Sequence, residues 1–136
     1  IEALLTNVFI KNAVARTRPY EAIDGLVNLI EKQKDYSFPS GHSGAAFAVM
    51  GAILVIAILG LPVAEKSGKI TRSKMSTAYK IVAVIAIIYA IALAFSRLYV
   101  GVHYPTDVIA GVIMGILLSY LAEYLVNLFA KKLKKA

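Results

Sequence analysis

Residues 43 to 64 read SGAAFAVMGAILVIAILGLPVA, a stretch without a single charged side chain. A membrane-spanning helix needs about 20 consecutive apolar residues to cross roughly 30 Å of hydrocarbon, and this stretch is long enough. Residues 81 to 96 are also uncharged, and residues 108 to 130 are interrupted only by Glu123. The pattern predicts an all-α, multi-pass transmembrane helical bundle whose spans cover about 43–64, 78–98 and 106–130.

The composition supports this fold class. Hydrophobic residues make up 59% of the chain and its mean hydropathy is +0.71, values above those typical of soluble domains. The length of 136 residues fits a single membrane-embedded domain, residues 1–136. The apolar segment IEALLTNVFI at the start is too short to span and begins with Ile, so we predict that residues 1–15 are the end of an earlier span and that the chain is a fragment lacking N-terminal spans. A secretory signal peptide is disfavoured, because no basic leading region or small-residue cleavage site precedes Lys11.

The charges are distributed as in a membrane protein. The net charge is +7, but the basic residues gather in the loop 65–77 and in the tail 131–135. Both segments lie on the same side if the spans alternate, and the positive-inside rule places that side in the cytoplasm. Such lysines are typical of membrane anchors, and without accompanying base-stacking residues they do not predict nucleic-acid binding. The chain contains no cysteine, which excludes a disulfide framework, a thiolate metal site and a cysteine nucleophile.

The opposite, extracytoplasmic side holds a segment from 20 to 38 that is too polar to span. Its apolar residues Ile23, Leu26, Val27 and Ile30 recur at helical spacing. This segment is therefore either an interfacial helix lying on the membrane or a connecting loop, and the sequence does not separate the two.

The first span is preceded directly by Pro39-Ser40-Gly41-His42. Ser40 or a neighbour is placed to cap the helix, and the first backbone N–H groups then attract anions. His42 adds an imidazole that can give or take a proton near neutral pH. Taken alone, this string also fits an ordinary helix cap.

The second and third spans are joined by a tight connection that carries Ser96, Arg97, His103 and Asp107. Pro105 suits the first turn of a helix, which places Asp107 in that turn and His103 just ahead of it. Asp107 can then accept the Nδ1 proton of His103, leaving Nε2 as a nucleophile that attacks phosphorus while Arg97 neutralises the phosphate oxygens. The alternative is an anchoring arginine beside an inert, hydrogen-bonded cap.

Lys11 and Arg18 supply two further cations before Pro19. They lie about two helical turns apart, and so on one face, if the segment is helical up to the proline. A basic helix end at a membrane surface is the simpler explanation for this pair alone.

Together the three strings, Lys11 to Pro19, Pro39 to His42 and Ser96 to Asp107, resemble in order and spacing the signature motifs of the type-2 phosphatidic acid phosphatase superfamily. The resemblance implies that His103 is the nucleophile, Asp107 its orienting carboxylate and the only carboxylate of the site, and His42 the acid that protonates the leaving group. It also implies a metal-independent reaction with no cofactor. The phosphate ligands would be Lys11, Arg18, Ser40, Gly41 and Arg97.

The activity implied by the resemblance is the hydrolysis of a lipid phosphate in the bilayer: a polyprenyl diphosphate, phosphatidylglycerol phosphate or phosphatidic acid. Two alternatives remain. One is a membrane transport or lipid-binding protein without turnover, which would more often carry charged groups within its spans. The other is a hydrolase with Zn²⁺ held by His42, His103 and Asp107, a site that the nearby cations would disfavour. The sequence does not indicate an oligomeric state, and the spacing of Gly111 and Gly115 suits close helix packing, within one chain or between two.

Overall fold

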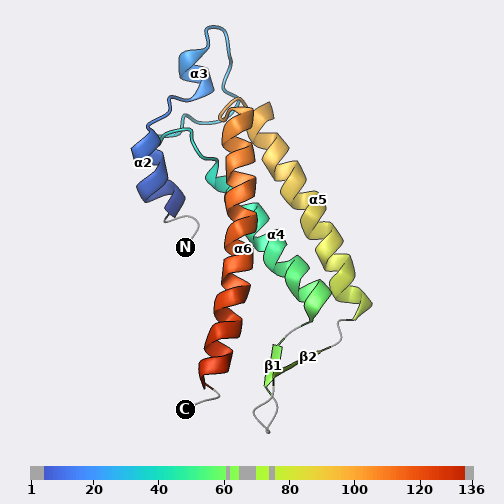
Figure 1. The fold of residues 1–136 in the computed structure, drawn as a ribbon. Coiled ribbons are helices and arrows are strands. Elements are labelled where there is room, and N and C mark those ends of the chain that lie inside the picture. The colour runs from blue at the N-terminus through green and yellow to red at the C-terminus, as the bar shows by residue number, and fades with distance from the viewer. Residues whose placement is uncertain (1–4, 61, 65–69, 74–75, 134–136) are drawn as a thin grey trace.

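The computed structural model describes residues 5–60, 62–64, 70–73 and 76–133. Three long helices dominate it. In chain order the elements are η1 (a π-helix, Leu5–Ile10), α2 (Lys11–Val14), α3 (Pro19–Ala22), α4 (Gly41–Leu59), β1 (Pro62–Ala64), β2 (Ile70–Arg72), α5 (Thr77–Tyr99) and α6 (Pro105–Leu133). Helix α3 and the β-hairpin lie at opposite ends of the long helices, and α2 lies beside the upper part of α6 (Figure 1).

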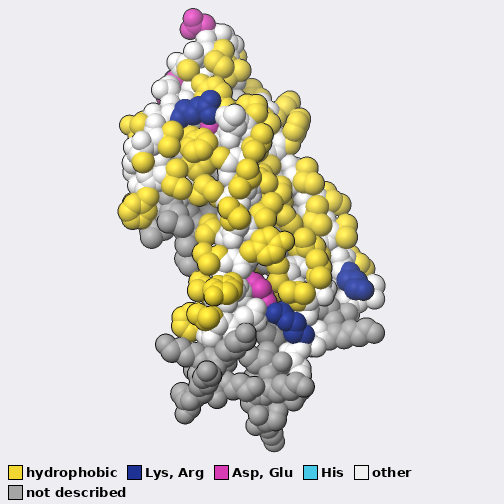
Figure 2. All heavy atoms as spheres, in the orientation of Figure 1, with side chains coloured by type: hydrophobic (Ala, Val, Ile, Leu, Met, Phe, Trp, Pro, Cys, Tyr) yellow, Lys and Arg dark blue, Asp and Glu magenta, His cyan; other side chains and the backbone are white. Residues whose placement is uncertain are grey.

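The long helices have the dimensions and the surface of membrane spans. Gly41–Leu59, Thr77–Tyr99 and Pro105–Phe129 are each long and apolar enough to cross a bilayer. Large apolar side chains point outward along them, and apolar atoms cover most of the face in Figure 2. Phe95 of α5, for example, is 66% exposed and Leu117 of α6 is 62% exposed. An apolar exterior is stable against lipid, so the predicted fold class, a multi-pass helical bundle, is confirmed.

Helix α4 packs against both α5 and α6, whereas α5 and α6 make few contacts with each other. Glycines allow the close approach of α4 and α6. A Cβ atom on Gly111 would lie 2.4 Å from the carbonyl oxygen of Ser40, and one on Gly115 would lie 2.3 Å from that of Gly44. The predicted glycine packing therefore occurs within one chain, and it fixes the N-terminus of α4 against the start of α6.

The first span is shorter than predicted. Helix α4 ends at Leu59, because Gly60 adopts φ +81° and Pro62 cannot continue a helix. The chain continues into β1, which pairs antiparallel with β2. Arg72 of β2 donates a hydrogen bond to the carbonyl oxygen of Gly60 at 3.1 Å and forms an ion pair with Glu123 of α6. Most of the basic loop 65–77 and the end of the tail 131–135 lie outside the described residues.

The segments at the end of the bundle opposite the β-hairpin contain less helix than the sequence pattern permitted. Helix α2 ends at Val14 because Ala15 adopts a left-handed conformation, with φ 49°. Arg18 is extended, as expected for the residue before a proline, so the helix does not continue to Pro19. Helix α3 ends at Ala22, and residues 23–40 form a loop rather than an interfacial helix. The prediction that residues 1–15 end an earlier span remains a prediction.

Candidate active site

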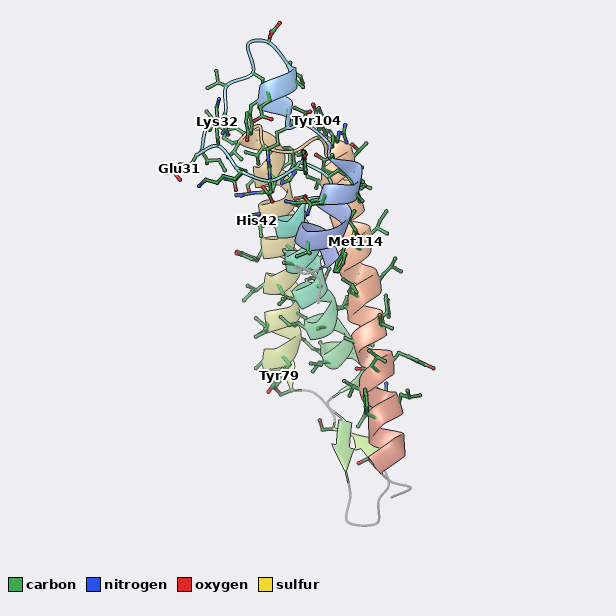
Figure 3. All side chains as sticks on the ribbon, turned by 90° about the vertical axis from the view of Figure 1, so that its left-hand side faces the viewer. Glu31, Lys32, His42, Tyr79, Tyr104 and Met114 are labelled. Atoms are coloured by element: carbon green, nitrogen blue, oxygen red, sulfur yellow. The ribbon has the colours of Figure 1, made fainter. Side chains whose placement is uncertain are left out.

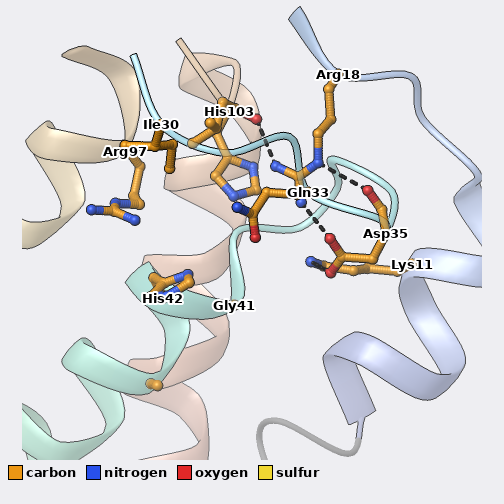
Figure 4. Close-up of a pocket in the computed structure, with 11 residues that line it drawn as sticks. Lys11, Arg18, Ile30, Gln33, Asp35, Gly41, His42, Arg97 and His103 are labelled. Atoms are coloured by element: carbon orange, nitrogen blue, oxygen red, sulfur yellow. Dashed lines mark hydrogen bonds and ion pairs between the residues drawn. The ribbon is translucent and has the colours of Figure 1, made fainter. Parts of the chain in front are cut away.

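A cavity of about 500 Å³ lies at the end of the bundle opposite the β-hairpin, where the loop 23–40 meets the helix ends. Figure 4 shows that its charged side chains come from segments far apart in the sequence. The residues that line it are Lys11, Arg18, Ile30, Gln33, Asp35, Gly41, His42, Ala45, Arg97, Val102 and His103. The fold therefore brings residues of all three sequence motifs to one pocket.

His103 is held in the tight turn between α5 and α6. Gly101 adopts φ +75° in this turn, and its backbone N–H donates to the carbonyl oxygen of Leu98 at 3.0 Å. Helix α6 then starts at Pro105, as predicted. The imidazole of His103 is buried but still lines the cavity, so one edge of the ring faces the protein interior and another faces the pocket.

Asp107 lies behind His103, away from the cavity, and is completely buried. Its Oδ2 atom accepts a hydrogen bond from the backbone N–H of Tyr104 at 2.9 Å, which caps the start of α6. The same oxygen lies 3.6 Å from Nδ1 of His103, an ion-pair distance rather than a direct hydrogen bond.

Two residues that the sequence analysis did not single out also hold Asp107. Ser37, fully buried in the loop, donates its hydroxyl to Oδ2 of Asp107 and lies 3.5 Å from Nδ1 of His103. Arg16 donates to Oδ1 of Asp107 at 2.7 Å, and its guanidinium stacks 3.9 Å from the ring centroid of Tyr104. These contacts stabilise the ionised carboxylate and fix the face that it presents to His103.

The N-terminus of α4 forms a second wall of the cavity. Gly41 and His42 line the cavity, whereas Ser40 does not. The buried hydroxyl of Ser40 caps α4 instead. It accepts a hydrogen bond from the backbone N–H of Ser43 at 3.4 Å and forms another with the Ser43 hydroxyl at 2.9 Å. Of the predicted phosphate ligands, Ser40 is thus the one that does not line the pocket.

Arg97, in the last turn of α5, points into the cavity near His42 (Figure 4). Its Nε donates to the hydroxyl of Ser96 at 3.1 Å. Within the part of the chain that the structure describes, no carboxylate lies within ion-pair distance of Arg97. Its charge is therefore available to an anion in the pocket.

Lys11 and Arg18 form a third wall of the cavity. Both side chains are almost completely buried, and both form ion pairs with Asp35. Asp35 was not predicted, and it corrects the expectation that Asp107 would be the only carboxylate of the site. Its pKa is lowered: burial alone would raise it, but the two cations outweigh burial. The carboxyl group is therefore ionised near neutral pH.

The pKa of His103 is lowered below its ordinary value. Burial is the main cause, because it disfavours the charged imidazolium, and the charges of Arg18 and Lys11 act in the same direction. Asp107 opposes the shift without reversing it. His103 is therefore mainly neutral near pH 7.

This shift predicts the acid limb of the pH profile. If neutral His103 is the reacting form, kcat/KM falls when the pH drops through the pKa of His103, and we expect that midpoint to lie below the ordinary value of about 6.5. Measuring kcat/KM from pH 4.5 to 8 on a soluble phosphate ester checks the expectation. A midpoint above that value would contradict it.

The donor set offers little to a metal ion. Among residues 5–60, 62–64, 70–73 and 76–133, no group of three or more His, Cys, Asp or Glu side chains is placed to hold one. His42 and His103 line the cavity, but Asp107 is directed at Ser37, Tyr104 and Arg16. The zinc site considered from the sequence is therefore not assembled.

The fold and the pocket together define a multi-pass helical membrane protein with a cationic, histidine-containing site at one end of its spans. The family comparison makes the assignment specific: the chain belongs to the PAP2 superfamily, whose model matches residues 1–131. The resemblance seen in the sequence is thereby confirmed.

Known relatives agree with this assignment. The chain is 34% identical to an undecaprenyl-diphosphatase of Sulfolobus acidocaldarius over 74% of its own length and 39% of the relative's. It is 35% identical to phosphatidylglycerophosphatase B of Bacillus subtilis over 79% of its own length and 44% of the relative's. Among solved structures, a transmembrane PAP2-type phosphatidylglycerolphosphate phosphatase from Bacillus subtilis aligns with 93% of the chain and 54% of that structure, with a TM-score of 0.66 and 30% identity. The chain thus spans less than half the length of these two curated relatives.

Proposed function

We propose that this protein is a metal-independent lipid phosphate phosphatase that hydrolyses a phosphomonoester or diphosphate through a phosphohistidine intermediate. The observation that carries the proposal is the position of His103. Its ring lies between the buried carboxylate of Asp107 and a cavity lined by Lys11, Arg18 and Arg97. A neutral imidazole, an orienting carboxylate and cations for the phosphate oxygens are the groups that this reaction requires.

In the proposed first step, Nε2 of His103 forms a bond to phosphorus as the bond from phosphorus to the leaving oxygen breaks. Asp107 stabilises the positive charge that develops on the imidazole. Arg97 and the amide groups at the start of α4 stabilise the phosphate oxygens, and His42 gives its proton to the leaving alcohol or phosphate. In the second step His42 takes a proton from water, which attacks phosphorus and releases inorganic phosphate and free His103.

An apolar groove supports a lipid substrate. It has a volume of about 470 Å³ and runs from His42 between α4 and α5. Val49 of α4 and Ile85 and Tyr89 of α5 line it, and all three are more than half exposed along the predicted span. Because His42 and Ala45 line both this groove and the cationic cavity, a hydrocarbon chain can lie in the groove while its phosphate reaches the histidines.

The test is inorganic phosphate release by the protein in detergent, with EDTA present. The panel contains a polyprenyl diphosphate, phosphatidylglycerol phosphate, phosphatidic acid and a water-soluble ester such as glycerol phosphate. We expect EDTA-resistant release from at least one lipid, with a much lower kcat/KM for the soluble ester. Activity abolished by EDTA would indicate a metal enzyme, and no release from any lipid would favour a transport or lipid-binding role.

We further propose that the protein resides in a cell membrane with its active site on the extracytoplasmic face. The support is the excess of basic residues in the loop 65–77 and in the tail, which belong in the cytoplasm by the positive-inside rule. Because residues 1–136 contain no cysteine, Lys32→Cys in the site loop and Ser73→Cys at the other end can be labelled separately in intact cells. An impermeant maleimide should label the first variant and not the second, and the reverse pattern would overturn the orientation.

A further inference from the structure

Asp35 places a negative charge beside Lys11 and Arg18, the two cations that bind phosphate in the proposed function. Its Oδ2 atom pairs with Nζ of Lys11, and its Oδ1 atom accepts from Nη2 of Arg18 at 2.6 Å. The cations are 5% and 3% exposed, whereas the side chain of Asp35 is 45% exposed. The carboxylate thus lies on the open side of two buried cations, where an anion entering from the cavity would bind.

The hydrogen bonds of Arg18 show that this contact competes with a ligand. A guanidinium has five N–H groups. Nε donates to the backbone carbonyl of Asp35 at 2.9 Å, and Nη1 donates to that of Val102 at 2.9 Å. Nη2 donates to the carboxylate of Asp35 and, at 3.4 Å, to the carbonyl of Tyr36. With these contacts formed, Arg18 cannot present two parallel N–H groups to a phosphate unless Asp35 moves away.

From these contacts we infer that Asp35 is an internal competitor for the phosphate subsite, bound to Lys11 and Arg18 when the site is empty and displaced when a phosphate binds. The inference rests on the proposed function, in which these two cations bind phosphate. A phosphate dianion has a larger charge than a carboxylate and can displace it, particularly when a lipid chain adds its own binding free energy. Inorganic phosphate, the product, faces the same competition without a lipid chain to add affinity, so Asp35 weakens product binding and promotes its release.

The test measures phosphate affinity directly. We would compare the wild type, Asp35→Asn and Glu31→Gln in detergent by equilibrium dialysis with radiolabelled inorganic phosphate, and by phosphate inhibition of lipid hydrolysis. Glu31→Gln is the matched control: it removes one negative charge from the same loop, and Figure 3 shows Glu31 pointing away from the bundle. We expect Asp35→Asn to bind phosphate at least about tenfold more tightly, since it removes a like charge beside the ligand, and Glu31→Gln to change affinity by less than about twofold.

Unchanged or weaker phosphate binding by Asp35→Asn would overturn the inference and show that Asp35 only holds the two cations in place. If the variant does not fold, an experimental structure of the wild type with bound phosphate decides the question. Asp35 must then have left Lys11 and Arg18, and ion pairs that persist beside bound phosphate would refute competition. A wild type that hydrolyses no lipid would refute the proposed function, while the dialysis would still test Asp35.

Discussion

His103→Ala should reduce lipid phosphate hydrolysis by at least about 1000-fold, because it removes the atom that we propose forms the bond to phosphorus. The imidazole is the only neutral nitrogen nucleophile in the cavity that has a buried carboxylate behind it, among the residues that the structure describes. The cations proposed to bind phosphate remain in the variant, so substrate binding should change much less than kcat. Initial rates in detergent, analysed as kcat and KM, check this expectation.

A chemical quench separates a nucleophile from a residue that only assists. The wild type is mixed with substrate that carries radioactive phosphorus and is quenched rapidly in base. This should trap an acid-labile phosphohistidine on the wild type and none on His103→Ala. Tyr99→Phe is a suitable control, since Tyr99 is 73% exposed at the end of the same helix that carries Arg97. A fully active His103→Ala variant, or label found on another residue, would contradict the assignment.

Asp107→Asn should lower kcat by roughly 100-fold to 10,000-fold with little change in KM. The amide nearly preserves the shape of the side chain but removes the charge that we propose stabilises an imidazolium on His103. The change also leaves the guanidinium of Arg16 without its counter-charge, now 2.7 Å from a neutral group. We therefore expect a loss of stability of about 1 to 3 kcal/mol as well.

A variant at a second acidic residue of α6 separates the effect of Asp107→Asn on kcat from its effect on stability. Glu123 forms an ion pair with Arg72 at the opposite end of the bundle. Glu123→Gln should therefore lose stability without losing kcat, whereas Asp107→Asn should lose both. Thermal unfolding and initial rates on the same preparations provide the comparison. If Asp107→Asn lost stability but kept its kcat, Asp107 would have only a structural role.

The sequence was most informative where function requires fixed residue types at fixed spacing. Residues of the Lys11 to Pro19, Pro39 to His42 and Ser96 to Asp107 strings meet around one cavity, and the apolar stretches predicted the three spans. The end of the first span was predicted less well, since the apolar run continues to Ala64 although Gly60 and Pro62 end the helix. Apolar content indicates burial in lipid but does not by itself fix where a helix stops.

Asp35, Ser37 and Arg16 could not be identified in the same way. Their partners are distant in sequence: Asp35 contacts Lys11, whereas Ser37 and Arg16 both contact Asp107. The loop that holds Asp35 and Ser37 has no periodic structure, so its sequence pattern does not indicate which side chains turn inward. One physical signal was present, because buried cations need a counter-charge, but several acids of the same segment could equally have supplied it.

In the proposed function, the groove between α4 and α5 determines how a substrate arrives. It runs along the spans and joins the cationic cavity at His42, so a lipid can enter by lateral diffusion within the membrane without leaving for water. The substrate concentration that sets the rate is then the mole fraction of substrate among the membrane lipids. Turnover should obey surface dilution kinetics: adding inert lipid at constant substrate slows the enzyme, whereas changing the volume of buffer around the same vesicles leaves its rate unchanged.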